Sequence, residues 1–246
     1  MRSVWMPKLD LIHWGYWLTF GWLFSIVLFR HFTSVDPAIT GLFYSPDAGF
    51  PLGDNALLNL LREWIWDGAI VVFLVAGLAW FWVARRRSLW GRGFGGGTLA
   101  GLSNTGWRAI FGTFLLGPGL IVNGWLKSFS GRARPANTTL FGGDKQFSLA
   151  GDFTDQCASN CSFVSGEVAA GTALAVTVWF VTAAVPYAWL RASLRGLGLL
   201  VPAFVIFQRV ATGRHFPSDA VFAVLITATI AWAFAVAHHV VRATQK

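Results

Sequence analysis

Six apolar runs recur along this chain, and each is long enough to cross a lipid bilayer. The hydrocarbon core of a bilayer is about 30 Å thick, which an α-helix of about 20 apolar residues spans. The apolar part of the fifth run ends early, at Gln208 and Arg209. The pattern predicts an all-α fold, in which residues 1–246 form a single domain built as a six-span transmembrane helical bundle. The runs cover residues 11–29, 68–84, 107–126, 166–190, 196–213 and 219–239.

Composition favours a membrane protein over a very hydrophobic soluble helical protein. Only 12% of the residues are charged and the mean hydropathy is +0.56, whereas soluble domains carry about 25% charged residues. The first run is long for the apolar part of a signal peptide, and the residues after it, Arg30-His31-Phe32, offer no small-residue cleavage site. We therefore expect the first run to be a permanent span.

Positive charge is distributed unevenly between the two sides of the predicted bundle. Eleven of the 19 lysines and arginines fall on the side of both termini, within residues 1–10, 85–108, 191–195 and 240–246, and eight fall on the other side. Cytoplasmic segments of membrane proteins are enriched in Lys and Arg. The bias predicts that both termini are cytoplasmic, and it accounts for the net charge of +8 without a nucleic-acid partner.

Four ionisable residues mark the outer ends of four different predicted spans. Lys127 ends the third run, Glu167 begins the fourth, Arg209 ends the fifth and Asp219 begins the sixth. A charged residue at the centre of a membrane helix costs about 2.5–3.5 kcal/mol, so such residues face interiors or interfaces and are usually functional. Membrane anchoring explains a lone Lys or Arg, but not carboxylates and a histidine at the same level. We expect these groups to converge on one pocket.

The residue types in these segments suit a phosphate group. Guanidinium groups bind phosphate through paired hydrogen bonds and an ammonium group binds it as a point charge, which are the contacts expected of Lys127, Arg134 and Arg209. Ser165-Gly166 precedes the fourth span, where the free N–H groups of a helix start attract an anion. The sequence therefore predicts a phosphate site between the spans.

A histidine and a carboxylate lie four residues apart at the start of the sixth span. A carboxylate near an imidazole fixes its tautomer and raises its basicity, which turns a histidine into a nucleophile. His215 and Asp219 are the candidates for this pair, and Pro217 between them is tolerated in a first helical turn.

Taken in order, these residues resemble the signature of the type 2 phosphatidic acid phosphatase superfamily, integral-membrane lipid phosphatases related to vanadium haloperoxidases. The resemblance rests on three polar segments, which are Lys127-x6-Arg134-Pro135, Ser165-Gly166 and Arg209-x5-His215-x3-Asp219, and it covers roughly residues 105–240. It implies six spans with the site at the outer, periplasmic face of a bacterial inner membrane, and neither a metal nor a cofactor. It also implies that His215 forms a phosphohistidine supported by Asp219, with the phosphate held by Lys127, Arg134, Ser165, Gly166 and Arg209.

The chain departs from that signature at two positions. Glu167 stands where the family usually has the histidine that protonates the leaving oxygen, and Gln208 replaces a serine. A glutamic acid can donate this proton if burial raises its pKa toward neutrality. Beside three cations it can instead stay ionised, and both readings stay open at this point. We assign Glu167 as the candidate general acid.

The function expected from this resemblance is metal-independent hydrolysis of a membrane lipid phosphate. A lipid A-type or polyprenyl phosphate is preferred, with phosphatidylglycerophosphate and phosphatidic acid as further substrates. The alternatives are a lipid phosphotransferase of the same superfamily, and a catalytically idle protein that binds or moves lipids. The phosphotransferase would be distinguished by a phosphorylated acceptor.

Two segments outside the spans are also informative. Residues 127–164 form a long irregular loop, which suggests a lid or a substrate entrance. Within it, Cys157 and Cys161 permit a disulfide in an oxidising compartment, with free thiols or metal ligation as alternatives. The section Asn55–Trp66 has amphipathic helical spacing, which fits a helix lying on the membrane surface or one packed against the bundle.

Overall fold

The computed structural model describes residues 8–90, 98–99 and 102–243, and over these residues the all-α prediction is confirmed. The only strands in this part of the chain are β1 (Thr98–Leu99) and β2 (Leu102–Ser103), which pair antiparallel. The helices are α1 (Lys8–His31), α2 (Val35–Gly41), α3 (Ala56–Trp90), α4 (Asn104–Phe114), α5 (Lys127–Phe129), α6 (Gly166–Thr182), α7 (Ala188–Ala211) and α8 (Pro217–Ala243). Short 3-10 turns are η1 (Pro51–Asp54), η3 (Pro135–Asn137) and η4 (Thr139–Phe141), and η2 (Leu115–Leu126) is a π-helix.

Within the described residues, five helical segments are long and apolar enough to cross a membrane, and α6 is a shorter apolar helix of 17 residues. This agrees approximately with six spans, although several boundaries differ from those expected. The fourth predicted span ends at Thr182 rather than at residue 190, because Pro186 disfavours helical geometry in the residue before it. The fifth is a full helix, α7, which begins eight residues before the predicted start at 196.

The amphipathic section Asn55–Trp66 does not form a separate helix. Except for Asn55 it belongs to α3, which continues through the second predicted span. The side chain of Asn55 accepts a hydrogen bond from the backbone N–H of Leu58 at 3.0 Å, as a helix N-cap does. The polar residues of this section therefore form the first turns of a spanning helix.

The third span is one continuous helix, Asn104–Phe129, made of α4, η2 and α5. Its π-helical part holds Pro118, and the side-chain amide of Asn123 donates to the carbonyl oxygen of Pro118 at 2.6 Å. A π-helix is rare and is frequently found at functional sites. Here it ends directly before Lys127.

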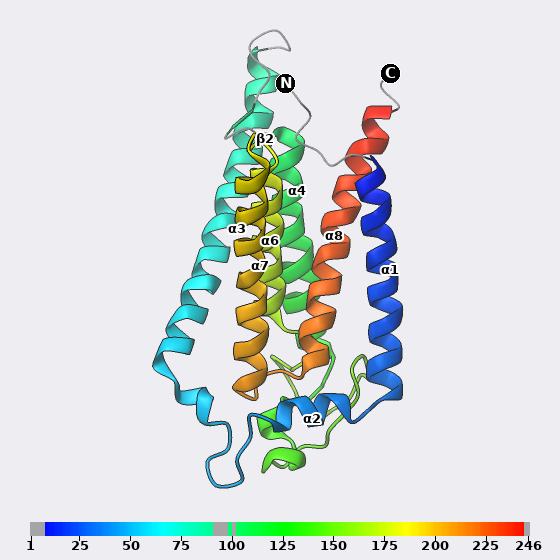
Figure 1. Cartoon of the computed structure of the whole chain (residues 1–246), viewed down its shortest axis with the longest axis vertical. Helices are drawn as coiled ribbons and strands as arrows, with labels where there is room; N and C mark the ends of the chain where they lie inside the picture. Colours follow the sequence, from blue (N-terminus) through cyan, green and yellow to red (C-terminus); the bar gives the residue numbers. More distant parts are fainter. Residues whose placement is uncertain (1–7, 91–97, 100–101, 244–246) are drawn as a thin grey trace.

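The bundle packs around α6, which contacts α3, α4, η2, α7 and α8 (Figure 1). The buried positions of α6 are small, with Ala169, Ala170 and Ala173 at most 3% exposed. Small side chains let membrane helices approach closely. The helix α6, which begins in the second polar segment, is therefore packed closely against α3, the continuous α4–η2 helix, α7 and α8.

The structure places the polar segments at one end of the bundle. The described ends of α1 and α8 lie together at the opposite end (Figure 1), consistent with an even number of crossings. The cytoplasmic location of that end stays a prediction from charge. Three of the cations that support it, Arg2, Arg92 and Lys246, lie outside the described residues.

Residues 130–165 form a loop below the bundle, beside α2 (Figure 1). Cys157 and Cys161 are joined by a disulfide bond, so the disulfide prediction is confirmed over free thiols. Among the described residues, no group of three or more His, Cys, Asp or Glu side chains could hold a metal ion.

Candidate active site

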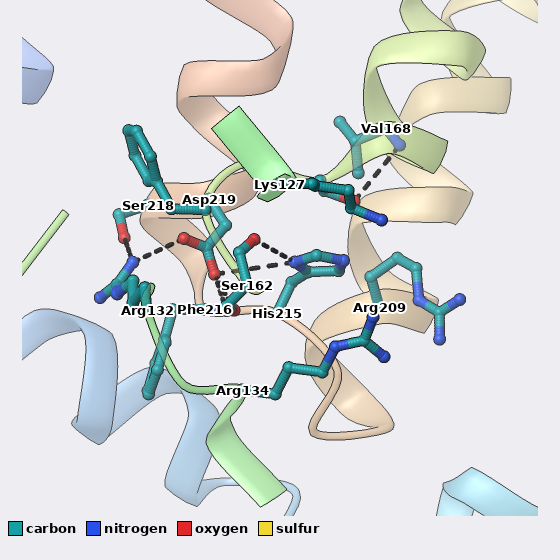
Figure 2. Close-up of polar contacts among 12 residues, drawn as sticks. Lys127, Arg132, Arg134, Ser162, Val168, Arg209, His215, Phe216, Ser218 and Asp219 are labelled. Atoms are coloured by element: carbon teal, nitrogen blue, oxygen red, sulfur yellow. Dashed lines mark hydrogen bonds and ion pairs between the residues drawn. The ribbon is translucent and has the colours of Figure 1, made fainter. Parts of the chain in front are cut away.

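The residues predicted from the three polar segments lie at this end of the bundle, and Figure 2 shows five of them together, namely Lys127, Arg134, Arg209, His215 and Asp219. They come from five places in the fold: the start of α5, the residue before η3, the start of α6, the last turn of α7, and the turn that leads into α8. In that order the residues are Lys127, Arg134, Ser165 with Gly166 and Glu167, Arg209, and His215 with Asp219.

His215 is held in the tight turn between α7 and α8. Its backbone N–H donates to the carbonyl oxygen of Arg209 at 3.1 Å. Gly213 in this turn has a φ of +66°, and a Cβ there would lie 2.4 Å from the ring of Phe50. Only glycine combines this conformation with this close approach. The five-residue spacing between Arg209 and His215 is therefore the length of one closed turn.

Hydrogen bonding determines the tautomer of His215. Its Nδ1 lies 2.7 Å from the carbonyl oxygen of Ser162, and because a carbonyl only accepts, Nδ1 carries the proton of the neutral ring. The lone pair then lies on Nε2, on the side of the ring where Lys127 and Arg209 lie (Figure 2). Burial, with these two cations adding to it against the opposing charge of Asp219, lowers the pKa of His215 to about 4. The ring is therefore neutral at pH 7, with the lone pair of Nε2 free.

Asp219 supports His215 less directly than the sequence suggests. Its Oδ2 lies 3.7 Å from Nδ1 of His215, which is beyond hydrogen-bond distance. That oxygen instead accepts from the hydroxyl of Ser162 at 2.5 Å and from the backbone N–H of Phe216 at 2.8 Å. Asp219 thus holds the segment whose carbonyl orients the ring, and it places a negative charge near the imidazole.

Arg132 is the main residue of the site that the sequence interpretation passed over. Its side chain is 0% exposed, and it binds Asp219 at 2.6 Å and Asp36 at 2.8 Å. It also donates to the hydroxyl of Ser218 at 2.8 Å and stacks over the ring of Phe216 at 4.5 Å. Burial raises the pKa of Asp36, and Arg132 opposes this shift. No sequence signal connects Asp36 with the third segment, because 183 residues separate it from Asp219.

Lys127 and Arg134 share a partner in the disulfide-closed loop. The Nζ of Lys127 donates to the side-chain oxygen of Asn160 at 3.2 Å, and a guanidinium N–H of Arg134 donates to the backbone oxygen of Asn160 at 2.9 Å. Burial lowers the pKa of Arg134, and the like charge of Arg214 adds to this shift. Asn160 therefore keeps the two cations at a fixed spacing while leaving their charge unneutralised.

Ser165 and Gly166 form the start of α6. The hydroxyl of Ser165 accepts from the N–H of Val168 at 3.4 Å, so the side chain caps the helix. A Cβ on Gly166 would lie 2.3 Å from the side-chain oxygen of Asn123. The π-helix and the start of α6 therefore meet at a position that only glycine fits.

This contact leads to a prediction for Gly166→Ala. We expect the added methyl group to push the start of α6 away from Asn123 and to lower kcat/KM for phosphate release by about 100-fold, because small misplacements of a site cost this much. Gly196→Ala is the matched control, since a Cβ at Gly196 meets nothing within 4 Å. Equal kcat/KM values for the two variants would contradict the role of this contact.

Glu167 lies between two arginines. Its Oε2 accepts from Arg209 at 2.5 Å and its Oε1 accepts from Arg62 at 2.7 Å. A carboxylate whose two oxygens each accept from a guanidinium group is ionised. The proton-donor role assigned to Glu167 from the sequence stays a prediction, and it requires the carboxylate first to gain a proton.

An apolar groove of about 530 Å³ lies between α1, η2 and α8. Leu126, Phe163 and Phe222 line it, and each lies within three positions of a polar residue of the site. Trp22 and Arg30 of α1 complete its other side. These helices have the length and composition of membrane spans.

Comparisons with known proteins agree with the arrangement of these segments. The sequence profile of the PAP2 superfamily matches residues 105–243. A protein of Rhizobium leguminosarum named lipid A 4'-phosphatase is 33% identical over 223 residues, which are 86% of this chain and 88% of that protein. A protein of the same name from Rhizobium etli is 31% identical over 85% of this chain and 79% of its own length. Another, from Francisella tularensis subsp. novicida, is 34% identical over 48% of this chain and 51% of its own. No solved structure gives a significant match.

Proposed function

This chain belongs to the PAP2 superfamily, and on that premise we propose that it hydrolyses the phosphate of a lipid A-type molecule through a phosphohistidine. The coarser function, a membrane lipid phosphatase, follows from the family and from relatives named lipid A 4'-phosphatase. The proposal adds the substrate, the mechanism and the residues that carry them.

The observation that carries the proposal is a buried, neutral His215 beside three cations. Its Nδ1 is occupied by the Ser162 carbonyl, which leaves Nε2 as the nucleophilic atom. Lys127, Arg134 and Arg209 supply the fixed positive charge that a phosphoryl group requires in its transition state. A neutral nucleophile beside three fixed cations fits phosphoryl transfer better than passive lipid binding.

The reaction proceeds in two displacements. Nε2 of His215 attacks phosphorus, the phosphorus–oxygen bond to the lipid breaks, and the leaving oxygen takes a proton from water or, once its carboxylate has gained a proton, from Glu167. The resulting imidazole carries phosphate on Nε2 and a proton on Nδ1, so it is positively charged. Asp219, 3.7 Å from Nδ1, stabilises that charge. Water then attacks phosphorus and gives one proton to the group that protonated the leaving oxygen, the electron pair of the phosphorus–nitrogen bond returns to Nε2, and inorganic phosphate leaves with His215 restored.

The apolar groove beside the site supports a lipid rather than a water-soluble substrate. Its volume of about 530 Å³ lies in the range of small-molecule pockets, and its lining suits an acyl chain. The apolar helices and the bacterial relatives indicate a multi-pass protein of a bacterial inner membrane. We propose that the site faces the periplasm, because the cation bias puts both termini in the cytoplasm.

A substrate panel tests the proposal. We expect purified protein to release inorganic phosphate from a lipid A-type phosphate with kcat/KM at least about tenfold higher than from phosphatidic acid, phosphatidylglycerophosphate or a polyprenyl diphosphate, since a site built for one headgroup leaves its polar groups unpaired with another. The measurement is phosphate release from each lipid in detergent.

The same panel separates the alternatives. A higher kcat/KM for the polyprenyl diphosphate would overturn the assigned substrate but would leave the assignment as a hydrolase unchanged. A phosphorylated second lipid in place of free phosphate would identify a phosphotransferase, and no turnover of any lipid phosphate would favour a protein that only binds or moves lipids.

A further inference from the structure

Arg62 lies in the first turns of α3, 43 residues before the part of the chain that matches the PAP2 profile. It nevertheless reaches the phosphate site through Glu167. We propose that Arg62 and Glu167 form a brace that positions Arg209 for the phosphate, which makes Arg62 a positioning residue of the site. This inference rests on the proposed function and names a further residue for it.

The brace is a chain of two ion pairs across three helices. Arg62 of α3 donates to Oε1 of Glu167 at 2.7 Å, and Arg209 of α7 donates to Oε2 at 2.5 Å. The side chains of Arg62, Glu167 and Arg209 are only 20%, 18% and 10% exposed. Ion pairs so far removed from water are weakly screened by salt. Glu167 is therefore held from both sides and cannot rotate without breaking one pair.

A second contact joins α3 and α7, one helical turn away from the brace. Gln208, the neighbour of Arg209, donates from its side-chain amide to the side-chain oxygen of Asn59 at 3.1 Å. Asn59 precedes Arg62 by three positions on α3, and residues three apart share one face of a helix. The serine of the family signature is replaced by Gln208 at this point, and the longer side chain makes the α3 contact. Two departures from the signature, Gln208 and Glu167, thus both engage α3.

The charges around Arg209 explain why it needs such a brace. Three other cations lie within electrostatic range of Arg209. They are Arg62 on α3, Lys127 on α5 and Arg214 in the turn before α8. Without the carboxylate, Arg209 would face like charges on several sides. Glu167 offsets that repulsion and leaves Arg209 directed into the site.

The guanidinium group of Arg209 keeps hydrogen-bonding capacity for a ligand. One of its terminal nitrogens donates to Glu167, whereas its Nε is buried and has no hydrogen-bond partner in the described part of the chain. A buried donor without an acceptor is costly and usually marks a ligand or a water. An oxygen of the bound phosphate meets this requirement, with the brace holding the opposite side of the group.

Inorganic phosphate is the probe that tests the brace. We expect Arg62→Met to raise the inhibition constant of inorganic phosphate and the KM of the lipid phosphate about tenfold, with a smaller change in kcat, because a misplaced Arg209 weakens one charge-assisted hydrogen bond to the phosphate. Arg62→Lys keeps the charge and one contact to Glu167, so it should recover part of the loss.

Two controls separate positioning from general damage. Glu63→Gln removes the other partner of Arg62, an exposed carboxylate at 2.8 Å, and should leave the inhibition constant unchanged. The double variant Arg62→Met with Glu167→Gln should lose no more than the more impaired single variant, because both act on Arg209 and their effects are not additive. A wild-type inhibition constant in Arg62→Met would overturn the inference, and so would full additivity of the two changes.

The test also distinguishes this inference from the proposed function. Phosphate binding can be followed without turnover by the rise of Tm with phosphate concentration, because a ligand that binds only the folded state stabilises it. If the wild type releases no phosphate from any lipid, the proposed function fails, while loss of the phosphate-dependent rise of Tm in Arg62→Met would still support the brace. If the wild type is active and Arg62→Met keeps the full rise, the brace alone is wrong.

Discussion

Replacement of His215 by alanine is expected to abolish phosphate release, with kcat reduced by about 10³-fold or more, because loss of a covalent nucleophile has effects of at least this size. The variant removes Nε2, the atom that forms the bond to phosphorus. The measurement is single-turnover phosphate release from the preferred lipid in detergent, in the presence of EDTA. The wild type should keep its activity in EDTA, since Lys127, Arg134 and Arg209 provide the positive charge.

Two controls accompany this prediction. His31→Ala removes an exposed histidine at the end of α1 and should leave kcat unchanged. A ³²P-labelled lipid should leave an acid-labile label on the wild-type protein but none on His215→Ala, as a phosphohistidine requires. Release that survives in His215→Ala, or release that EDTA eliminates from the wild type, would contradict the mechanism.

The local parts of the site could be predicted from sequence because each is contained in one short segment. The spacing between Arg209 and His215 reflects a single turn closed at Gly213, and Ser165-Gly166 reflects a capped helix start. Segments of this kind depend on local backbone chemistry, which single-sequence patterns report well. The convergence of the site residues could then be predicted, because the sequence places all three polar segments at the same membrane face.

The long-range parts could not be predicted in this way. Arg62, Asp36 and Arg132 are single charges in loops or at helix ends, and such residues are usually solvated. Arg62 pairs with Glu167, which lies 105 residues further along the chain. Arg132 pairs with Asp36, 96 residues before it, and with Asp219, 87 residues after it. Nothing in the local composition specifies which charges become neighbours once helices pack. The start of α7 was missed for a different, local reason: Arg191 and Arg195 in its first turns interrupt the apolar run, so the predicted span began at residue 196.

Replacement of Arg132 by methionine is expected to reduce the stability of the protein more than any other single charge removal at the site. Arg132 is 0% exposed, and its guanidinium group binds both Asp36 and Asp219. Methionine fills much of the same volume but leaves two buried carboxylates without a counter-charge. Breaking a buried ion pair from one side costs about 3–5 kcal/mol. The measurement is Tm in detergent, followed together with the yield of monodisperse protein.

The controls for Arg132 rest on burial and on charge balance. Arg30 forms an ion pair with Asp152 in which the side chains are 49% and 39% exposed, so Arg30→Met should cost at most about 1 kcal/mol. Adding Asp36→Asn to Arg132→Met removes one of the unpaired carboxylates and should restore part of the lost Tm, because the cost arises from uncompensated charge rather than from lost volume. If Arg132→Met is as stable as Arg30→Met, the buried network does not hold Asp219 in place. Orientation of His215 would then depend on the carbonyl of Ser162 alone.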